Sequence, residues 1–285
     1  DIIRYNFITY PKYGFIVCSF IIFLYLCYHQ FEYVHFGYCL SSFEKIEDMK
    51  KVFIALANQK GGSGKSTLCA LFANYLVEKG KKLFVGDFDN QGTLVSARKS
   101  DLLFFPETDV PYNLKGYEIA LEGPHTIKEN YDYINAKLDE MPSSVDVVLL
   151  DTPGNLDEDN LLSLFQRMDY IITPFAYDRG SWDSLKMYRK ALRILKSPKY
   201  EYKAHFEVFF ILNKFDSRIG TTEEHAVWAD MNKILSGEGL LTPMIKNIAE
   251  LKRFNTLFLT RKQRETVLPC FDFIYQQIFG EEDRK

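Results

Sequence analysis

Residues 60–67 read Lys-Gly-Gly-Ser-Gly-Lys-Ser-Thr, and this stretch decides the fold. Its glycines let backbone N–H groups approach a phosphate chain closely, which is typical of a phosphate-binding loop. Lys65 is placed to reach the β- and γ-phosphates of a nucleotide, and Ser66 to offer its hydroxyl to Mg²⁺. The general pattern G-x-x-x-x-G-K-[ST] begins with glycine, but this chain has Gln59 there, followed by Lys60. The additional lysine indicates one particular subclass of nucleotide hydrolases.

The sequence on either side of the loop predicts the strand and the helix that such a loop requires. A phosphate loop binds its ligand between a buried strand and a helix N-terminus, whose free N–H groups point at the phosphates. Residues 52–57 form a continuous apolar run, as in parallel strands that are covered on both faces. Apolar residues then recur at helical spacing from Leu68 to Leu76, and Gly80 follows as the C-terminal cap.

Two further apolar strands end in aspartates. Residues 83–86 lead into DFDNQGT at 87–93, and residues 147–150 lead into DTPG at 151–154. Because the C-terminal ends of parallel strands face the ligand crevice, Asp87, Asp89 and Asp151 are expected to converge near Mg²⁺. Each aspartate taken alone could equally be a helix cap or a turn former. Together with the loop, these strands predict a P-loop NTPase fold: a doubly wound, mainly parallel α/β sheet with helices on both faces.

The three segments together resemble the ParA/MinD family of ATPases, and ParA-type partition proteins in particular. The resemblance covers roughly residues 49–280. It implies a nucleotide-dependent homodimer that binds ATP and Mg²⁺ and hydrolyses ATP slowly. It further implies non-specific DNA binding, a centromere-binding, ParB-like partner protein, and a cytoplasmic, nucleoid-associated role in partition of plasmid or mobile-element DNA. A related ATPase that positions a protein cargo, in conjugation or division-site placement, is the alternative.

The resemblance also implies a role for each residue of the site. Lys60 matches the signature lysine that reaches the partner subunit's nucleotide, and Lys65 matches the loop lysine. Asp89 would position the attacking water and complete the candidate catalytic set. The candidate metal-site residues are Ser66, Asp87 and Asp151, and the other expected nucleotide contacts are Gly61, Gly62, Ser63, Gly64, Thr67 and Asn213. The family usually has Pro where this chain has Asn90, and often where it has Gly154, which puts the rate of hydrolysis in question.

The next predicted strand, residues 206–212, raises the question of which base is bound. It ends in Asn213-Lys214-Phe215-Asp216, which matches the N-K-x-D pattern by which many GTPases read guanine. In ParA-like proteins, an Asn at this strand end is expected to meet adenine. The phosphate-loop pattern is the more specific signal, so we expect ATP; a GTP-binding regulatory module is the alternative. Lys214 and Asp216 also fit an ordinary turn.

Composition separates an extension, residues 1–48, from an ATPase domain, residues 49–285. The net charge of -3 gives no global signal for nucleic acid, and the five cysteines show no zinc-binding spacing. Residues 14–28 form an uncharged apolar run that is shorter than the roughly 20 residues of a membrane-spanning helix. The extension could be a membrane anchor, an interfacial segment, or upstream sequence foreign to the native protein. We favour the third, because Met49 leads directly into the first strand, and we expect the segment to pack poorly.

The remaining sequence predicts helices and a local basic cluster. The expected helices cover residues 156–168, 182–195, 226–235 and 266–279, with a helix and loops in 101–140. A strand is expected over residues 170–173 and ends at Pro174, and the helix at 226–235 has Val227, Met231 and Ile234 on one apolar face. Asp178 and Arg179 are expected to form a solvated loop pair. The basic cluster is a candidate DNA contact, or simply a solvated face, and consists of Lys252, Arg253, Arg261, Lys262 and Arg264. An acidic tail at residues 281–283 makes a basic membrane-binding helix, and hence membrane association, unlikely.

Overall fold

The computed structural model describes residues 51–89, 91–105, 117–120, 135–136, 138–154, 161–200 and 204–280. Lys50–Lys285 forms one compact unit. The N-terminal extension, Asn90 and the acidic tail lie outside the described residues, so the expectations for them stay predictions.

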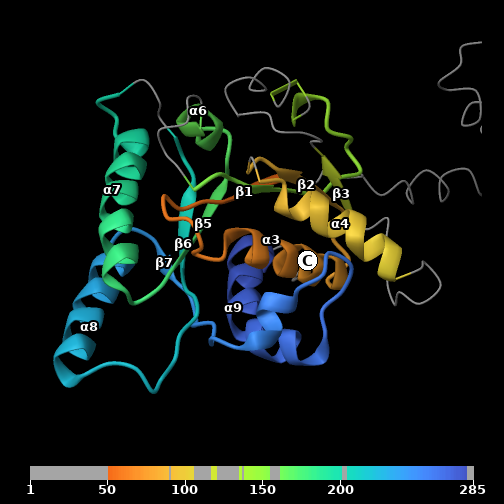
Figure 1. The fold of residues 1–285 in the computed structure, drawn as a ribbon. Helices are drawn as coiled ribbons and strands as arrows, with labels where there is room; N and C mark the ends of the chain where they lie inside the picture. The colour runs from red at the N-terminus through yellow and green to blue at the C-terminus, as the bar shows by residue number, and fades with distance from the viewer. Residues whose placement is uncertain are drawn as a thin grey trace, which may run out of the picture. The chain divides into compact units, whose positions relative to one another are not determined.

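The centre of the described unit is a seven-stranded sheet in the order β3-β2-β4-β1-β5-β6-β7. Every neighbouring pair in it is parallel (Figure 1). The strands are β1 (Val52–Leu56), β2 (Leu83–Asp87), β3 (Tyr117–Ala120), β4 (Val147–Asp151), β5 (Tyr170–Phe175), β6 (Glu207–Leu212) and β7 (Leu240–Leu241). β3 lies in a stretch for which the sequence predicted only a helix and loops. β3 pairs with β2 and forms one edge of the sheet, so its pairing with a distant strand defines it.

Helices cover both faces of this sheet. They are α3 (Lys65–Glu78), α4 (Thr93–Phe104), α6 (Leu161–Phe165), α7 (Arg179–Lys196), α8 (Thr222–Ser236), the 3₁₀ helix η3 (Ala249–Arg253) and α9 (Arg261–Phe279). In β1, Ile54 and Leu56 pack in one cluster with α3 and α9, whereas Ala55 packs in a second cluster with α6 and α7. Alternate strand residues therefore face opposite helical layers. The predicted doubly wound α/β fold is confirmed.

Three details of the predicted elements were wrong. Pro174 does not end β5, which continues to Phe175; Pro174 lies beyond the residues that pair with β1, so its missing N–H breaks no bond of that ladder. α9 begins at Arg261, five residues earlier than expected, with a capping box between Thr260 and Gln263. The face expected to be buried in α8 is only partly buried, because α8 lies against a two-residue strand.

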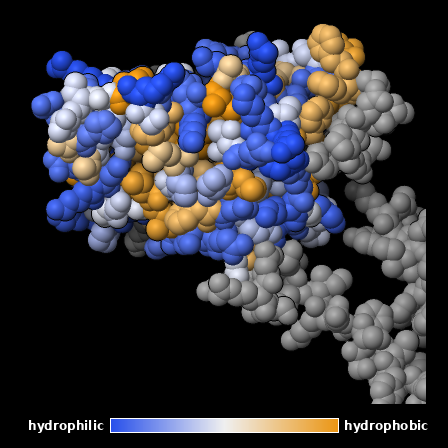
Figure 2. Space-filling view, turned by 90° about the horizontal axis from the view of Figure 1, so that it is seen from below, coloured by the Kyte–Doolittle hydropathy of each residue, from blue (hydrophilic) through white to orange (hydrophobic). Residues whose placement is uncertain are grey.

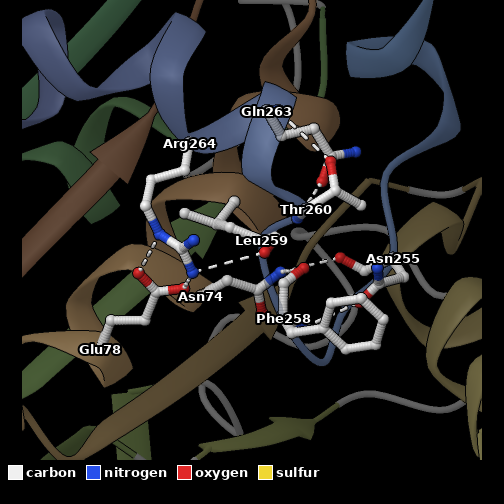
Figure 3. A network of polar contacts seen from close by, with 8 residues as sticks. All are labelled: Asn74, Glu78, Asn255, Phe258, Leu259, Thr260, Gln263 and Arg264. Carbon is white, nitrogen blue, oxygen red and sulfur yellow. Dashed lines mark hydrogen bonds and ion pairs between the residues drawn. The ribbon is translucent and has the colours of Figure 1, made fainter. Parts of the chain in front are cut away.

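A network of polar contacts fastens α3 to the C-terminal part of the chain (Figure 3). The buried Asn74 amide donates to the carbonyl oxygens of Asn255, at 2.9 Å, and Phe258, at 3.1 Å. Arg264 of α9 donates to both carboxylate oxygens of Glu78, at 2.9 and 2.6 Å. Asn74 lies beyond the middle of α3 and Glu78 is its last residue, so these bonds hold the C-terminal half of α3. They thereby also hold its first turn, which follows the phosphate loop.

The face of the molecule in Figure 2 is mostly hydrophilic, with apolar residues in separate patches. Among the described residues, no helix combines the length and the apolar character that a membrane span requires.

Candidate nucleotide-binding site

A cavity of about 610 Å³ opens at the C-terminal ends of the parallel strands. Most of the predicted site residues line it: Gly61, Gly62, Gly64, Lys65, Ser66, Thr67, Asp89 and Asn213. Another part of the lining was not predicted as site residues, namely Gln91, Thr93, Lys246, Asn247, Ile248, Leu251 and Lys252. Most of these follow β7 and form no pattern of their own, so their place at the cavity becomes visible only in the folded chain.

The loop from β1 to α3 is held in a conformation that leaves the helix N-terminus open. Gly64 is the N-cap of α3 with φ of 99°, and no side chain caps the first N–H groups of this helix. A Cβ atom on Gly64 would lie 2.4 Å from the amide nitrogen of Asn213. The glycine is therefore required both by the backbone conformation and by the close approach of β6. The free N–H groups are available to an anion in the cavity.

Lys65 is the buried cation of the site. Its side chain begins the first turn of α3, and only 6% of the residue is exposed. Burial lowers the pKa of its ammonium group, while the negative charges of Asp151 and Asp89 oppose that shift. A positive charge held against two carboxylates and facing a cavity is suited to an incoming polyphosphate.

Asp87 and Asp151 lie side by side at the ends of β2 and β4, as the sequence predicted. One oxygen of Asp87 accepts from the backbone N–H groups of Leu94, at 2.8 Å, and Val95, at 3.1 Å. Its other oxygen is buried and lacks a hydrogen-bond partner of regular geometry, as do both oxygens of Asp151. Asp87 therefore caps α4 with one oxygen and keeps the other buried beside Asp151; neither aspartate lines the cavity itself. The helix-cap and metal-site interpretations are compatible.

These buried oxygens fit a hard divalent cation. Burial raises the pKa of Asp151 to about 7, although the Ser66 hydroxyl and the Lys65 ammonium favour its ionised form. Burial also raises the pKa of Asp87. Carboxylate and hydroxyl oxygens are the ligands that Mg²⁺ prefers, and this ion retains several waters and binds substrate phosphates. A bound Mg²⁺ would neutralise phosphate charge and hold both carboxylates ionised.

Asp89 lies in the turn between β2 and α4, at the rim of the cavity. Its carboxylate accepts from the Gln91 N–H at 3.0 Å, and its carbonyl accepts from the Gly92 N–H at 2.8 Å. Both bonds stabilise the turn and leave the Asp89 side chain at the cavity. Its role in positioning the attacking water stays a prediction. Across the cavity, a Cβ on Gly154 would lie 3.3 Å from the Lys65 ammonium and 3.3 Å from the Gly61 nitrogen.

Lys60 lies apart from the lining of this cavity. Its ammonium donates to Asp178 at 2.6 Å, and the Lys60 side chain is 33% exposed. Asp178 also accepts from the Ser181 N–H at 2.8 Å, so it is the N-cap of α7, and Arg179 is the first residue of that helix. The expected solvated Asp178–Arg179 loop pair was therefore wrong, because Asp178 has a capping function and a more distant partner. Partial burial opposes ionisation of Asp178, but the hydrogen bonds from Lys60 and Ser181 lower its pKa.

The residues after β6 separate into two groups. Asn213 donates to the Ser63 carbonyl at 2.9 Å, and the Lys214 ammonium donates to the Gly62 carbonyl. Ser63 is thus joined to the site through its carbonyl, although it does not line the cavity. Asp216 instead accepts from the Arg218 guanidinium at 2.9 and 2.7 Å and does not line the cavity. The first two residues of the N-K-x-D pattern belong to the site, and the fourth does not.

Comparison with known proteins identifies the family. The model of the CobQ/CobB/MinD/ParA nucleotide-binding domain matches residues 54–256. The chain belongs to this family. Membership in the CobQ/CobB/MinD/ParA family confirms the resemblance inferred from the three motifs and makes residues 54–256 a nucleotide-binding domain of this family.

Two curated relatives are similar to part of this chain. The chromosome-partitioning ATPase Soj of Thermus thermophilus is 34% identical over 119 residues, which is 36% of this chain and 46% of Soj. A putative replication protein A of Rhizobium rhizogenes is 24% identical over 241 residues, 69% of this chain and 58% of that protein. The matches therefore span about half the length of these curated relatives.

Solved structures share the fold of this family member at low sequence identity. A putative plasmid partition protein of Borrelia burgdorferi, bound to AMPPNP, has a TM-score of 0.59 at 16% identity and covers 80% of this chain and 100% of its own. A variant of Cyanothece McdA in complex with ATP has a TM-score of 0.60 at 14% identity, covering 80% and 96%. Cobyrinic acid a,c-diamide synthase of Mycobacterium smegmatis, with an ATP analogue and magnesium, has a TM-score of 0.58 at 18% identity, covering 82% and 97%.

Proposed function

We propose that this protein is a Mg²⁺-dependent ATP switch of the ParA type, which dimerises on ATP, hydrolyses it slowly and takes part in partition of plasmid or mobile-element DNA. The cavity supports nucleotide binding because its lining includes an open helix N-terminus and the buried Lys65, whose charge interacts with the neighbouring carboxylate of Asp151. The names of its relatives, a chromosome-partitioning ATPase and plasmid partition proteins, favour partition as the process.

The position of Lys60 is the observation that carries the proposed dimer. A lysine of the phosphate loop would ordinarily face the phosphates, but Lys60 points to Asp178, and its side chain remains partly exposed. A partly exposed cation outside the lining of its own subunit's cavity can reach the nucleotide of a second subunit. There it would stabilise the charge that develops during phosphoryl transfer, as an arginine finger does. The site of one subunit is then completed by the other.

The chemistry around Asn213 favours adenine over guanine. Guanine presents donors at N1 and N2, and a protein reads them with an acceptor such as a carboxylate. Asp216 has both oxygens engaged by Arg218 and lies away from the cavity lining. Asp89 is the one carboxylate among the cavity-lining residues, and it lies in the turn before α4, not after β6. ATP is therefore the proposed substrate.

Most of the positive charges in the basic cluster are paired with carboxylates of the same subunit or lie at the nucleotide cavity. Lys262 pairs with Glu250 at 2.6 Å, Arg261 with Glu265 at 2.8 Å, and Arg264 with Glu78 at 2.6 Å. Lys252 lines the nucleotide cavity. Carboxylates of the same subunit therefore offset much of the positive charge, so we propose that non-specific DNA binding depends on two copies of the surface in the ATP dimer. A ParB-like partner that stimulates hydrolysis, and a nucleoid location, belong to the same proposal.

Substitution of Lys60 tests the shared site. Lys60→Ala should leave the affinity of the monomer for fluorescent ADP within about threefold of wild type, because Lys60 does not line its own cavity. The same variant should lose the ATP-dependent dimer, measured by analytical ultracentrifugation, or lower ATP turnover at least tenfold, about the effect of one lost charge contact at a transition state. Lys186→Ala, which removes an exposed lysine paired with Asp183 on α7, is the matched control.

The same two variants test the switch on DNA. Wild type and Lys186→Ala should retain DNA in a gel shift with ATP, but not with ADP or without nucleotide, and Lys60→Ala should retain it in none. Equal retention in all three nucleotide states would contradict the switch and would favour an ATPase that positions a protein cargo.

A further inference from the structure

Lys214 follows β6 and lies where two parts of the site meet. It lines the cavity, and its ammonium donates to the carbonyl of Gly62 in the phosphate loop. The preceding residue, Asn213, donates to the next loop carbonyl, that of Ser63, at 2.9 Å. Two consecutive residues of one strand end therefore hold two consecutive carbonyls of the loop.

Holding these carbonyls also fixes the groups that would face a phosphate. A trans peptide unit is planar, and its C=O and the following N–H point in opposite directions. The carbonyls of Gly62 and Ser63 are directed at Lys214 and Asn213, so the N–H groups of Ser63 and Gly64 are directed away from these two residues. Backbone N–H groups of such a loop form the concave cradle that binds an anion. Their orientation therefore depends on the bonds that Asn213 and Lys214 make.

The backbone of Lys214 shows that this arrangement is imposed by its surroundings. Among the described residues, Lys214 is the one non-glycine residue with a positive φ, at 58°. A lysine adopts this left-handed conformation when other contacts over-determine it. Two contacts do so here: its N–H donates to the Asn213 side-chain oxygen at 2.9 Å, and its ammonium donates to Gly62.

We propose that Lys214 is a positioning residue of the phosphate cradle, which orients the loop N–H groups through the Gly62 carbonyl. The inference rests on the proposed nucleotide binding and deepens it. It assigns the residue to the triphosphate, whereas the N-K-x-D pattern would assign it to a guanine base. The Lys214 ammonium binds the Gly62 carbonyl of the loop, and the loop N–H groups bind the phosphates.

Ligand fragments separate this role from a contact with the base. We compare Mg²⁺-tripolyphosphate with adenosine by isothermal titration calorimetry in wild type, Lys214→Met and Lys214→Arg. Lys214→Met keeps an unbranched side chain without the ammonium, and it should bind tripolyphosphate about tenfold more weakly and adenosine within about twofold of wild type. Lys214→Arg keeps a donor for Gly62 and should restore tripolyphosphate affinity to within about threefold.

Two controls exclude loss of folding and simple loss of charge. Lys214→Gly removes the ammonium and relieves the backbone, so it should unfold at a temperature no lower than wild type and still lose tripolyphosphate affinity. Lys246→Met removes a positive charge from the same cavity, and any loss it causes should shrink at 0.5 M KCl. The loss in Lys214→Met should persist at that salt concentration, since it comes from the geometry of the loop.

Unchanged tripolyphosphate affinity in Lys214→Met would overturn the inference. A loss confined to adenosine would overturn it too, because Lys214 would then contact the base. If wild type binds neither Mg²⁺-ATP nor Mg²⁺-tripolyphosphate, the proposed function fails, and this inference fails with it.

Discussion

At the scale of single residues, the site depends on how closely two backbone segments approach. Gly64 combines a left-handed φ of 99° with a position where a Cβ would lie 2.4 Å from the Asn213 amide. Gly64→Ala should therefore strain the loop and displace Asn213 from the Ser63 carbonyl. We expect at least a hundredfold loss of ADP affinity, because several cradle bonds of about 1 kcal/mol each fail together. Fluorescent-ADP titration measures this loss.

Gly61→Ala is the matched control, since a Cβ on Gly61 would meet nothing within 4 Å. It should weaken ADP much less than Gly64→Ala. Equal losses in the two variants would show that the loop needs glycine for its flexibility alone, and that the approach of Asn213 is unimportant.

At the scale of elements, α3 is held by the loop before α9. The buried Asn74 amide bonds to the carbonyls of Asn255 and Phe258, and its loss would leave both acceptors without that donor. Asn74→Ala should lower the free energy of unfolding by about 1–3 kcal/mol, the cost of unsatisfied buried polar groups. Urea denaturation measures it.

The comparison variant is Glu265→Ala, which breaks the exposed ion pair between Glu265 and Arg261 in α9. Such a pair is worth about 0.3–0.5 kcal/mol, so this variant should be nearly as stable as wild type. Comparable destabilisation by the two substitutions would show that α9 itself, and not the buried amide, fastens α3.

At the scale of the whole molecule, the buried carboxylates make stability depend on pH. Burial raises the pKa of Asp151 from 3.8 to about 7, so between these values the folded protein holds a proton that the unfolded chain has released. The contribution of Asp151 to the free energy of unfolding therefore falls as pH rises from about 4 to about 7, by at most about 4 kcal/mol. It is constant above pH 7, where both states are ionised.

Urea unfolding in EDTA at pH 5, 6, 7 and 8 measures this dependence. Asp151→Asn should reduce the slope relative to wild type, and an unchanged slope would show that Asp151 does not titrate in this range. Mg²⁺-ATP binding should become tighter as pH rises through 7, because the cation requires the ionised carboxylate. Asp87, whose pKa is also raised by burial, contributes in the same direction.

Local sequence was sufficient for the parts of the site that follow one another in the chain. A buried strand, a glycine-rich loop and an amphipathic helix are each specified by nearby residues, so β1, α3 and the aspartates after β2 and β4 could be predicted. The bounds of α9 and the exposure of α8 could not, because packing partners distant in sequence decide them. Lys246 and Asn247 were missed for the same reason: they carry no motif, and they reach the cavity through the position of β7.

The fold class and the phosphate loop could be predicted from the chain alone, because periodicity and spacing record which backbone each segment adopts. The resemblance to the family came from the three motifs. Tertiary structure alone decided the partners of the polar groups. It paired Lys60 with Asp178, Lys214 with Gly62, Lys262 with Glu250, and Arg264 with Glu78. Hydrogen bonds and ion pairs form over a few ångströms in space, and the distance between residues along the chain does not restrict them.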